Sequence, residues 1–420
     1  MSSILNGAGS NAPRAFKELY DLWFNKQGKK TKYLKALEKE EISLPNMSSI
    51  LSGAGVNAPK AFKELYDLWF DEKRNKSQHL RTLEGNGINL SNMSGILCGA
   101  GADAAKVFKD LYDACFDETG NKTERLRTLR KEGINLSNMS NILHGARANA
   151  AKAFKDLYNL WFDEKGNKTK YLRTLEKEGI NLANISSILG GAGANTVKAF
   201  KDLYDLSFDQ HGNKSEYLKT LEKEGIGLSN MFSILSGAGA SAAKAFKELY
   251  DAFFDRQGNK TQRLKHFTKK IDGKKGFKPS NLSSILGRAG ANAKDAFEKL
   301  HSICFNNEGG RTRLLDDFYK AGFKSSNLSC ILCGAGANAS SILRRLHSIF
   351  FNDEGERTKL LDGFYKAGFR PYDLSNMLSR AVDSVEKFYD FCFVGETKKY
   401  LNHFLKRKEC FTLSNLCNIL

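Results

Sequence analysis

The residues best suited to bind a ligand recur at a fixed spacing along the chain. A Gly-Ala-Gly-like turn followed by a basic residue returns every 46 residues from Gly7 to Gly237. The second glycines and the basic residues of this series are Gly9, Arg14, Gly55, Lys60, Gly101, Lys106, Lys152, Gly193, Lys198, Gly239 and Lys244. If each turn opens a helix, its free backbone N–H groups and the positive end of the helix dipole can hold a phosphate. The pattern therefore predicts a row of phosphate-binding positions.

The residue just before the first glycine changes from copy to copy, while its neighbours hardly change. These varied residues are Asn6, Ser52, Cys98, His144, Gly190, Ser236, Gly287, Cys333 and Ser379. A structural position in a repeat usually keeps one residue, whereas a position that reads a partner must differ between copies. The alternative is a solvent-exposed turn that tolerates any side chain.

A repeat of three helices would position these turns. Met139, Ile142 and Leu143 form one apolar stripe on a short first helix, and apolar residues from Ala150 to Phe162 form the stripe of a longer second helix. A third helix is expected from about residue 169 to a glycine at 179. We expect Ser137 to cap the first helix and Asn149 to cap the second.

The period continues beyond residue 268 with looser register. The next equivalents of the first glycine are Arg288, Gly334 and Arg380, after an insertion around residues 272–276. Such a period is typical of stacked arrays in which each unit needs its neighbours. We expect an all-α, right-handed superhelical α-solenoid of about nine 46-residue repeats. Residues 1–268 would form regular repeats, and residues 269–420 divergent repeats and a C-terminal cap.

Composition narrows the functional classes. Lys and Arg number 65 against 47 Asp and Glu, a formal charge of +18, which favours a polyanionic partner; solubility is the alternative explanation. The eight cysteines are scattered, which indicates free thiols in a reducing compartment, and Cys330 and Cys333 form a lone pair without further metal ligands. Catalytic motifs, metal sites and cofactors are not expected, so we predict a protein that is not an enzyme.

The sequence also predicts a soluble protein, expected to be a monomer. No basic-then-apolar leader follows Met1, and no apolar run reaches the length of a membrane span. A second basic series, formed by Asn-Lys pairs such as Asn167-Lys168, lies in the loop after the second helix. It could follow the other side of a duplex or be a solvated turn whose charges offset nearby acidic residues.

The segment from Ile142 through the turn to Phe154 resembles the repeats of TAL-effector and TAL-effector-like DNA-binding proteins. In that family a short helix, a turn with variable residues and glycines, and a basic helix follow one another, and the variable side chain points at one base in the major groove. The likeness covers about a third of each repeat. Family repeats are shorter, have two helices, and carry two variable residues where this chain has one that varies strongly.

The resemblance implies that the nine varied residues read bases, with the glycines and the Arg/Lys series on phosphates. Asn and His can hydrogen-bond base edges, and Gly can leave room for a thymine methyl. Double-stranded DNA is the expected partner, in the cytoplasm of a bacterium or after delivery to a host nucleus. The alternatives are an α-solenoid scaffold or effector for protein partners, and single-stranded RNA read one base per repeat.

Overall fold

Helices in a recurring order of three make up the structure. The computed structural model describes residues 3–6, 8–134, 136–144, 146, 149–270, 276–366 and 368–381. Throughout these residues the fold is all-α, and extended backbone pairs only in isolated bridges such as that between Phe162 and Lys168. The expected C-terminal cap and most of the expected insertion lie outside the described residues.

The first helix of each repeat is short and bears no charged residue until the last copy. These helices are α3 (Leu44–Ile50), α6 (Leu90–Leu97), α9 (Leu136–Leu143), α12 (Leu182–Leu189), α15 (Leu228–Leu235), α18 (Pro279–Ile285), α21 (Ser325–Ile331) and α24 (Pro371–Ala381). Each buries the predicted stripe, which in α9 consists of Met139, Ile142 and Leu143.

The second helix follows a one-turn 3-10 helix and provides most of the core. These helices are α1 (Ala12–Trp23), α4 (Ala58–Trp69), α7 (Ala104–Cys115), α10 (Ala150–Trp161), α13 (Thr196–Ser207), α16 (Ala242–Phe253), α19 (Ala293–Cys304) and α22 (Ala339–Phe350). The 3-10 helices before them include η1 (Gly9–Asn11), η2 (Gly55–Asn57), η3 (Gly101–Asp103), η5 (Gly193–Asn195), η6 (Gly239–Ser241), η7 (Gly290–Asn292) and η8 (Gly336–Asn338).

The expected third helix is present in every described repeat. The third helices are α2 (Lys32–Lys39), α5 (Gln78–Glu84), α8 (Glu124–Lys131), α11 (Lys170–Lys177), α14 (Glu216–Lys223), α17 (Gln262–Thr268), α20 (Arg313–Lys320) and α23 (Lys359–Lys366). Gly179, predicted to end α11, has a φ of 73°, the left-handed conformation that glycine supplies after a helix.

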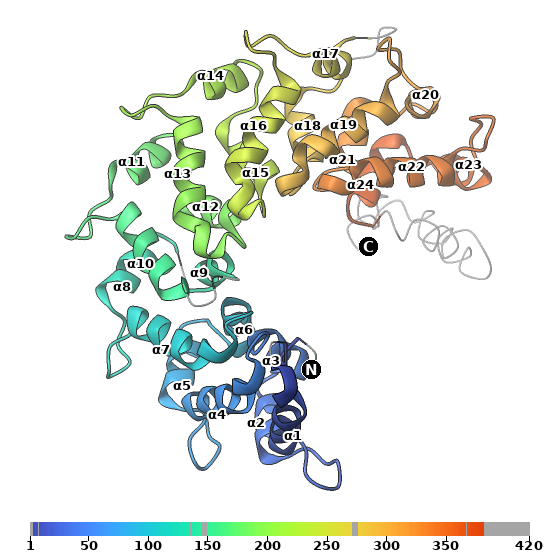
Figure 1. Cartoon of the computed structure of the whole chain (residues 1–420). Coiled ribbons are helices and arrows are strands. Elements are labelled where there is room, and N and C mark those ends of the chain that lie inside the picture. Colours follow the sequence, from blue (N-terminus) through green and yellow to red (C-terminus); the bar gives the residue numbers. More distant parts are fainter. Residues whose placement is uncertain are drawn as a thin grey trace, which may run out of the picture. The chain divides into compact units, whose positions relative to one another are not determined.

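The chain divides into two compact units: Met1–Asn213 with Gly237–Ala243, and Lys214–Ser236 with Lys244–Leu420. In the first unit α3, α6, α9 and α12 pack side by side in sequence order, as do α1, α4, α7, α10 and α13. In the second unit α15, α18, α21 and α24 form the equivalent row. Within each unit the first and third helices lie on opposite edges (Figure 1). The turns after the first helices therefore share one edge of each unit.

Aromatic side chains join consecutive repeats. The predicted stripe of α10, from Ala150 to Phe162, is buried as expected. The Trp161 ring lies edge-on to Phe200 of the next repeat, with centroids 6.1 Å apart, and Trp69 meets Phe108 in the same way at 6.0 Å. Because half of each pair belongs to the neighbouring repeat, a single repeat cannot bury its own apolar face.

Both predicted helix caps are wrong. Asn57, the equivalent of Asn149, has helical φ and ψ values of −85° and 0° and makes no side-chain cap hydrogen bond. The preceding 3-10 helix already turns the chain, so this side chain cannot fold back over the free N–H groups. At the first helix, Asn89 caps α6 by accepting a hydrogen bond from the Asn92 backbone N–H. The equivalent of Ser137 lies two residues later, inside the helix, where it cannot cap.

Candidate nucleic-acid interface

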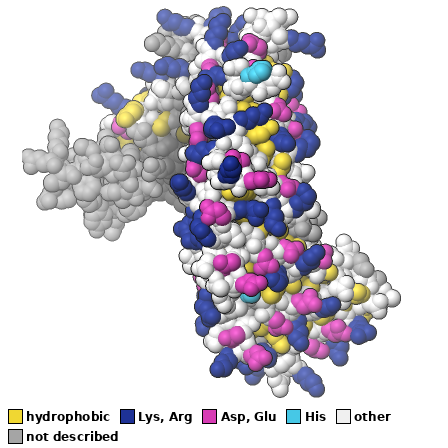
Figure 2. All heavy atoms as spheres, turned by 90° about the vertical axis from the view of Figure 1, so that its left-hand side faces the viewer, with side chains coloured by type: hydrophobic (Ala, Val, Ile, Leu, Met, Phe, Trp, Pro, Cys, Tyr) yellow, Lys and Arg dark blue, Asp and Glu magenta, His cyan; other side chains and the backbone are white. Residues whose placement is uncertain are grey.

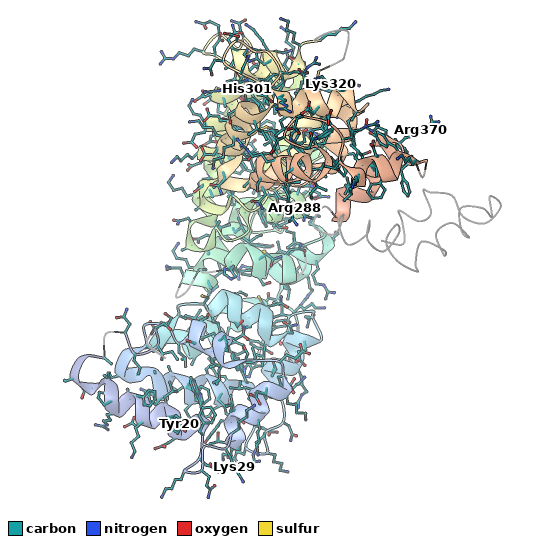
Figure 3. The ribbon with its side chains drawn as sticks, turned by 90° about the vertical axis from the view of Figure 1, so that its right-hand side faces the viewer. Tyr20, Lys29, Arg288, His301, Lys320 and Arg370 are labelled. Carbon is teal, nitrogen blue, oxygen red and sulfur yellow. The ribbon has the colours of Figure 1, made fainter. Side chains whose placement is uncertain are left out.

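The turn between the first and second helices has a defined backbone. In the second repeat Ser52 follows α3, Gly53 takes a φ of 78°, and Gly55 opens η2 with a φ of 58°. Two left-handed residues so close together reverse the chain in a few residues, and non-glycine residues adopt this conformation at a cost. Arg288 replaces the first glycine in one copy and also has a positive φ of 65° (Figure 3).

Each turn is fastened to the first helix of the preceding repeat. The backbone N–H of Gly53 donates to the Ser3 carbonyl over 2.8 Å, that of Gly99 to Ser49 over 2.7 Å, and that of Gly191 to Asn141 over 2.9 Å. The second unit repeats the contact from Arg288 to Ser233 and from Gly334 to Ser284. These bonds hold successive turns in the same register along the edge of each unit.

The second glycines of the turns are packing residues. Gly55, Gly101, Gly193 and Gly239 are buried, and Gly9 begins η1. A Cβ added to Gly101 would lie 3.1 Å from the Ser52 carbonyl oxygen and 3.3 Å from the Ala54 nitrogen of the preceding turn. The absence of a side chain therefore lets two backbones approach closely, which explains the glycines without any ligand. The basic residues of this series remain the candidates for phosphate contacts.

The varied residues differ in exposure. Asn6, His144 and Cys333 are exposed, Ser52, Cys98, Gly190 and Ser236 are half-buried, Gly287 is buried, and Ser379 lies within α24. Because Gly287 has no side chain and its backbone is covered, any contact at that step must be to a neighbouring residue. The prediction that Ser379 lies in a turn is wrong, because α24 continues to Ala381 in this copy. The other varied residues whose exposure is described are at least partly exposed.

The predicted phosphate-binding cations lie in the first turn of the second helix and are exposed. Five of them face an acidic residue one turn later in the same helix: Arg14 with Glu18, Lys60 with Glu64, Lys152 with Asp156, Lys198 with Asp202, and Lys244 with Glu248. Lys106 is exposed as well. Charges of both signs are likewise interspersed on the face shown in Figure 2. Exposed pairs of this kind are screened by water and contribute little to stability, so another anion can replace the carboxylate.

The second basic series has a structural role. Lys168 lies between Glu176 of its own third helix and Glu132 of the preceding repeat, with its Nζ 2.6 Å from an oxygen of each. Lys76 makes the same double contact, with Glu84 and Glu40. These lysines join consecutive repeats, so of the two interpretations of this series the structure favours charges balanced by neighbouring acids.

The loop that carries these lysines is folded around an aspartate. The Asp163 carboxylate accepts hydrogen bonds from the backbone N–H groups of Lys165 and Asn167, at 2.9 and 2.8 Å. These bonds, chiefly those from Asn167, lower the pKa of Asp163. The loop extends outward at the edge opposite the turns, and Lys29 marks its tip in the first repeat (Figure 3).

Sequence reasoning missed a row of polar contacts between third and second helices of consecutive repeats. In the second unit the His266 Nδ1 lies 3.0 Å from the His301 Nε2, and the His347 Nε2 lies 2.9 Å from an oxygen of buried Asp317. The signal was present in the sequence. Positions that hold Thr and Tyr in the repeats from Thr82 to Tyr250 change together to His and His, and then to Asp and His.

The His301 site predicts a pH dependence of stability. Burial, helped by nearby His266 and Arg263, lowers the pKa of His301 to about 4. An unfolded histidine titrates near 6.5, so between these values the unfolded chain binds the proton that the folded chain rejects. The contribution of neutral His301 to the free energy of unfolding should be fully present above about pH 6.5 and should decrease as the pH drops towards 4. Urea midpoints at about pH 7.5 and pH 5 should differ less in His301→Tyr, which restores the residue of earlier repeats; an equal difference would contradict this origin.

Other chemistry of the described residues is limited. Cys115 and Cys304 are fully buried thiols, and burial raises the pKa of each to about 12. In this part of the chain, no three His, Cys, Asp or Glu side chains gather as a metal-binding group. Every helix described here is too short or too polar to cross a bilayer.

The function of this site has to be inferred from its geometry. No protein-family model matches the chain, and no curated protein matches it significantly.

Proposed function

We propose that this chain is a modular, non-enzymatic nucleic-acid-binding protein that reads double-stranded DNA through the varied residues of its turns. In this proposal about nine repeats continue into one right-handed superhelix, as an α-solenoid would. Asn6, Ser52, Cys98, His144 and their equivalents then face the bases, and the Arg/Lys series contacts phosphates. Base contacts would provide selectivity and phosphate contacts most of the affinity.

The observation that carries this proposal is the combination of fixed backbone and changing side chain. The turns of each unit are held in one register by the same backbone hydrogen bond, yet the residue presented there is Asn, Ser, Cys, His or Gly. A modular DNA-binding protein requires a backbone that is the same in each repeat and a side chain that differs between repeats. The residues that surround it within its own turn stay nearly constant, so they do not require this residue to change.

The placement of the cations supports phosphate binding. Lys60, Lys106, Lys152 and their equivalents occupy the first turn of the second helix, which holds no acidic residue of its own and lies at the positive end of the helix dipole. Their weak pairs with residues one turn later can be exchanged for a phosphate oxygen, which carries a full negative charge. The likeness to TAL-effector-like repeats agrees with this arrangement, although the third helix and the longer repeat depart from that family.

A protein-binding scaffold is the second candidate, favoured by one observation. The cations of α4, α7 and α13 are matched within each helix by the same number of acidic residues, so these helices are neutral. A neutral surface with charges of both signs suits a protein partner as well as a nucleic acid. Single-stranded RNA remains the third partner class to test.

Selection from a library of random DNA duplexes tests the proposal. The wild-type chain should enrich a defined sequence, and His144→Ser should change the preference at one base position by roughly tenfold. Lys152→Ala should instead weaken binding to all sequences alike, because phosphates carry no base identity. Recovery of no preferred duplex, together with tighter binding to single strands or to a protein ligand, would reject the proposal.

A further inference from the structure

One varied residue lies against a glycine of the preceding repeat. The His144 ring, at the end of α9, covers Gly95 in the middle of α6. A Cβ placed on Gly95 would lie 2.8 Å from the His144 Cδ2 and 3.4 Å from its Nε2. Real side chains do not approach so closely, so the ring occupies this place only because residue 95 has no side chain.

The contact follows from the register shared by all turns. We call the residue three positions before each varied residue the seat residue. In the described turns of each unit, seat residues such as Ser3, Ser49 and Asn141 accept the backbone hydrogen bond from the turn of the next repeat. Asn141 is the seat residue below Gly190. The backbone N–H of Gly191, the residue after Gly190, donates to the Asn141 carbonyl over 2.9 Å. Within a unit, these turns therefore place the varied residue next to one particular residue of the preceding repeat.

The sizes of the two residues compensate. The smallest seat residue, Gly95, lies below His144, the largest varied residue, whereas the large seat residue Asn141 lies below Gly190, which has no side chain. The other described pairs within the units combine small residues: Ser3 with Ser52, Ser49 with Cys98, Ser233 with Gly287, and Ser284 with Cys333. Two large residues never meet at one step of these pairs, although both positions accept large residues separately.

We propose that each recognition step is set by a pair of residues from consecutive repeats, the varied residue and the seat residue below it. Gly95 acts as a positioning residue that gives the His144 ring its orientation, and Asn141 supplies the side chain that Gly190 lacks. This inference rests on the proposed function. Asn141 is exposed at the turn edge, and its amide offers one donor and one acceptor, the combination that pairs with the N6 and N7 of adenine.

The substitution Gly95→Ser provides a conservative test, because serine is the commonest seat residue of the other repeats and suits the same helix. In selections from random DNA duplexes, Gly95→Ser should reduce the preference at the His144 step by roughly tenfold. It should have no further effect in a His144→Ser background, where no ring needs the space. Asn141→Ser should change the preference only at the Gly190 step. An unchanged preference in Gly95→Ser, or equal losses at every step, would overturn the proposal.

A measurement without DNA separates this inference from the proposed function. In the free full-length chain with labelled histidine and glycine, the Hδ2 of His144 should give a nuclear Overhauser contact to an α-proton of Gly95, and His144→Ser assigns the signal. Its absence would overturn the pairing whatever the chain binds. If the contact is present but no duplex is selected, the proposed function fails at the level of the ligand, and the role of the seat residue in recognition fails with it.

Discussion

Binding of duplex DNA should weaken about a thousandfold when the salt concentration rises from roughly 50 mM to roughly 200 mM. The estimate follows if the six cations Arg14, Lys60, Lys106, Lys152, Lys198 and Lys244 each neutralise one phosphate and release its counterion. The logarithm of affinity would then fall against the logarithm of salt with a slope of about −5. Fluorescence anisotropy of a labelled duplex at several salt concentrations measures this slope directly.

The two basic series provide matched variants for this experiment. Lys152→Ala should make the slope shallower by about 1, since one phosphate contact disappears. Lys168→Ala should leave it almost unchanged, because that lysine is held by Glu132 and Glu176. A flat salt response of the wild type, or equal effects of both variants, would contradict the assignment of phosphate contacts to the first series.

Replacing Gly336 by alanine should destabilise its repeat by about 3 kcal/mol, the second large effect that we expect. Gly336 has a φ of 53°, and an added Cβ would lie 3.0 Å from both the Ala289 nitrogen and the Gly287 carbonyl oxygen, and 3.1 Å from the Arg288 carbonyl carbon. All three are backbone atoms of the preceding turn, which cannot move aside as a flexible side chain can. Left-handed strain and overpacking therefore add.

Gly334 in the same turn is the control. Its φ of 72° is also left-handed, but an added Cβ would meet no atom within 4 Å. Gly334→Ala should therefore cost only the conformational strain, about 1 kcal/mol. Native-state hydrogen exchange of the α22 amides reports the local opening energy, which is preferable for an array whose repeats need not unfold together. An equal loss of stability in both variants would show that a Cβ at residue 336 does not clash with the backbone of the preceding turn.

The sequence was sufficient for the organisation of the chain because periodicity is local information. The 46-residue spacing, the apolar stripes and the glycine after the third helix predicted three helices per repeat, an all-α fold and a buried aromatic row, and the structure confirms each of them. Spacing alone also placed the varied residues in turns after the first helices, and only for Ser379, which lies inside α24, was this prediction wrong among the described copies. Partner, superhelix handedness and base-reading roles stay predictions.

Tertiary structure decided the roles of the residues that recur from repeat to repeat, because these roles depend on contacts between repeats. Gly101 looked like a phosphate-binding glycine, but it lies against the backbone of the preceding turn. Asn149 and Asn57 looked like helix caps, but neither makes a side-chain cap hydrogen bond. Lys168 could have followed a duplex or offset nearby acidic residues, and the structure shows that it joins two glutamates from different repeats. A single repeat determines its own helices, whereas the neighbour that packs against it determines which of its polar groups remain available.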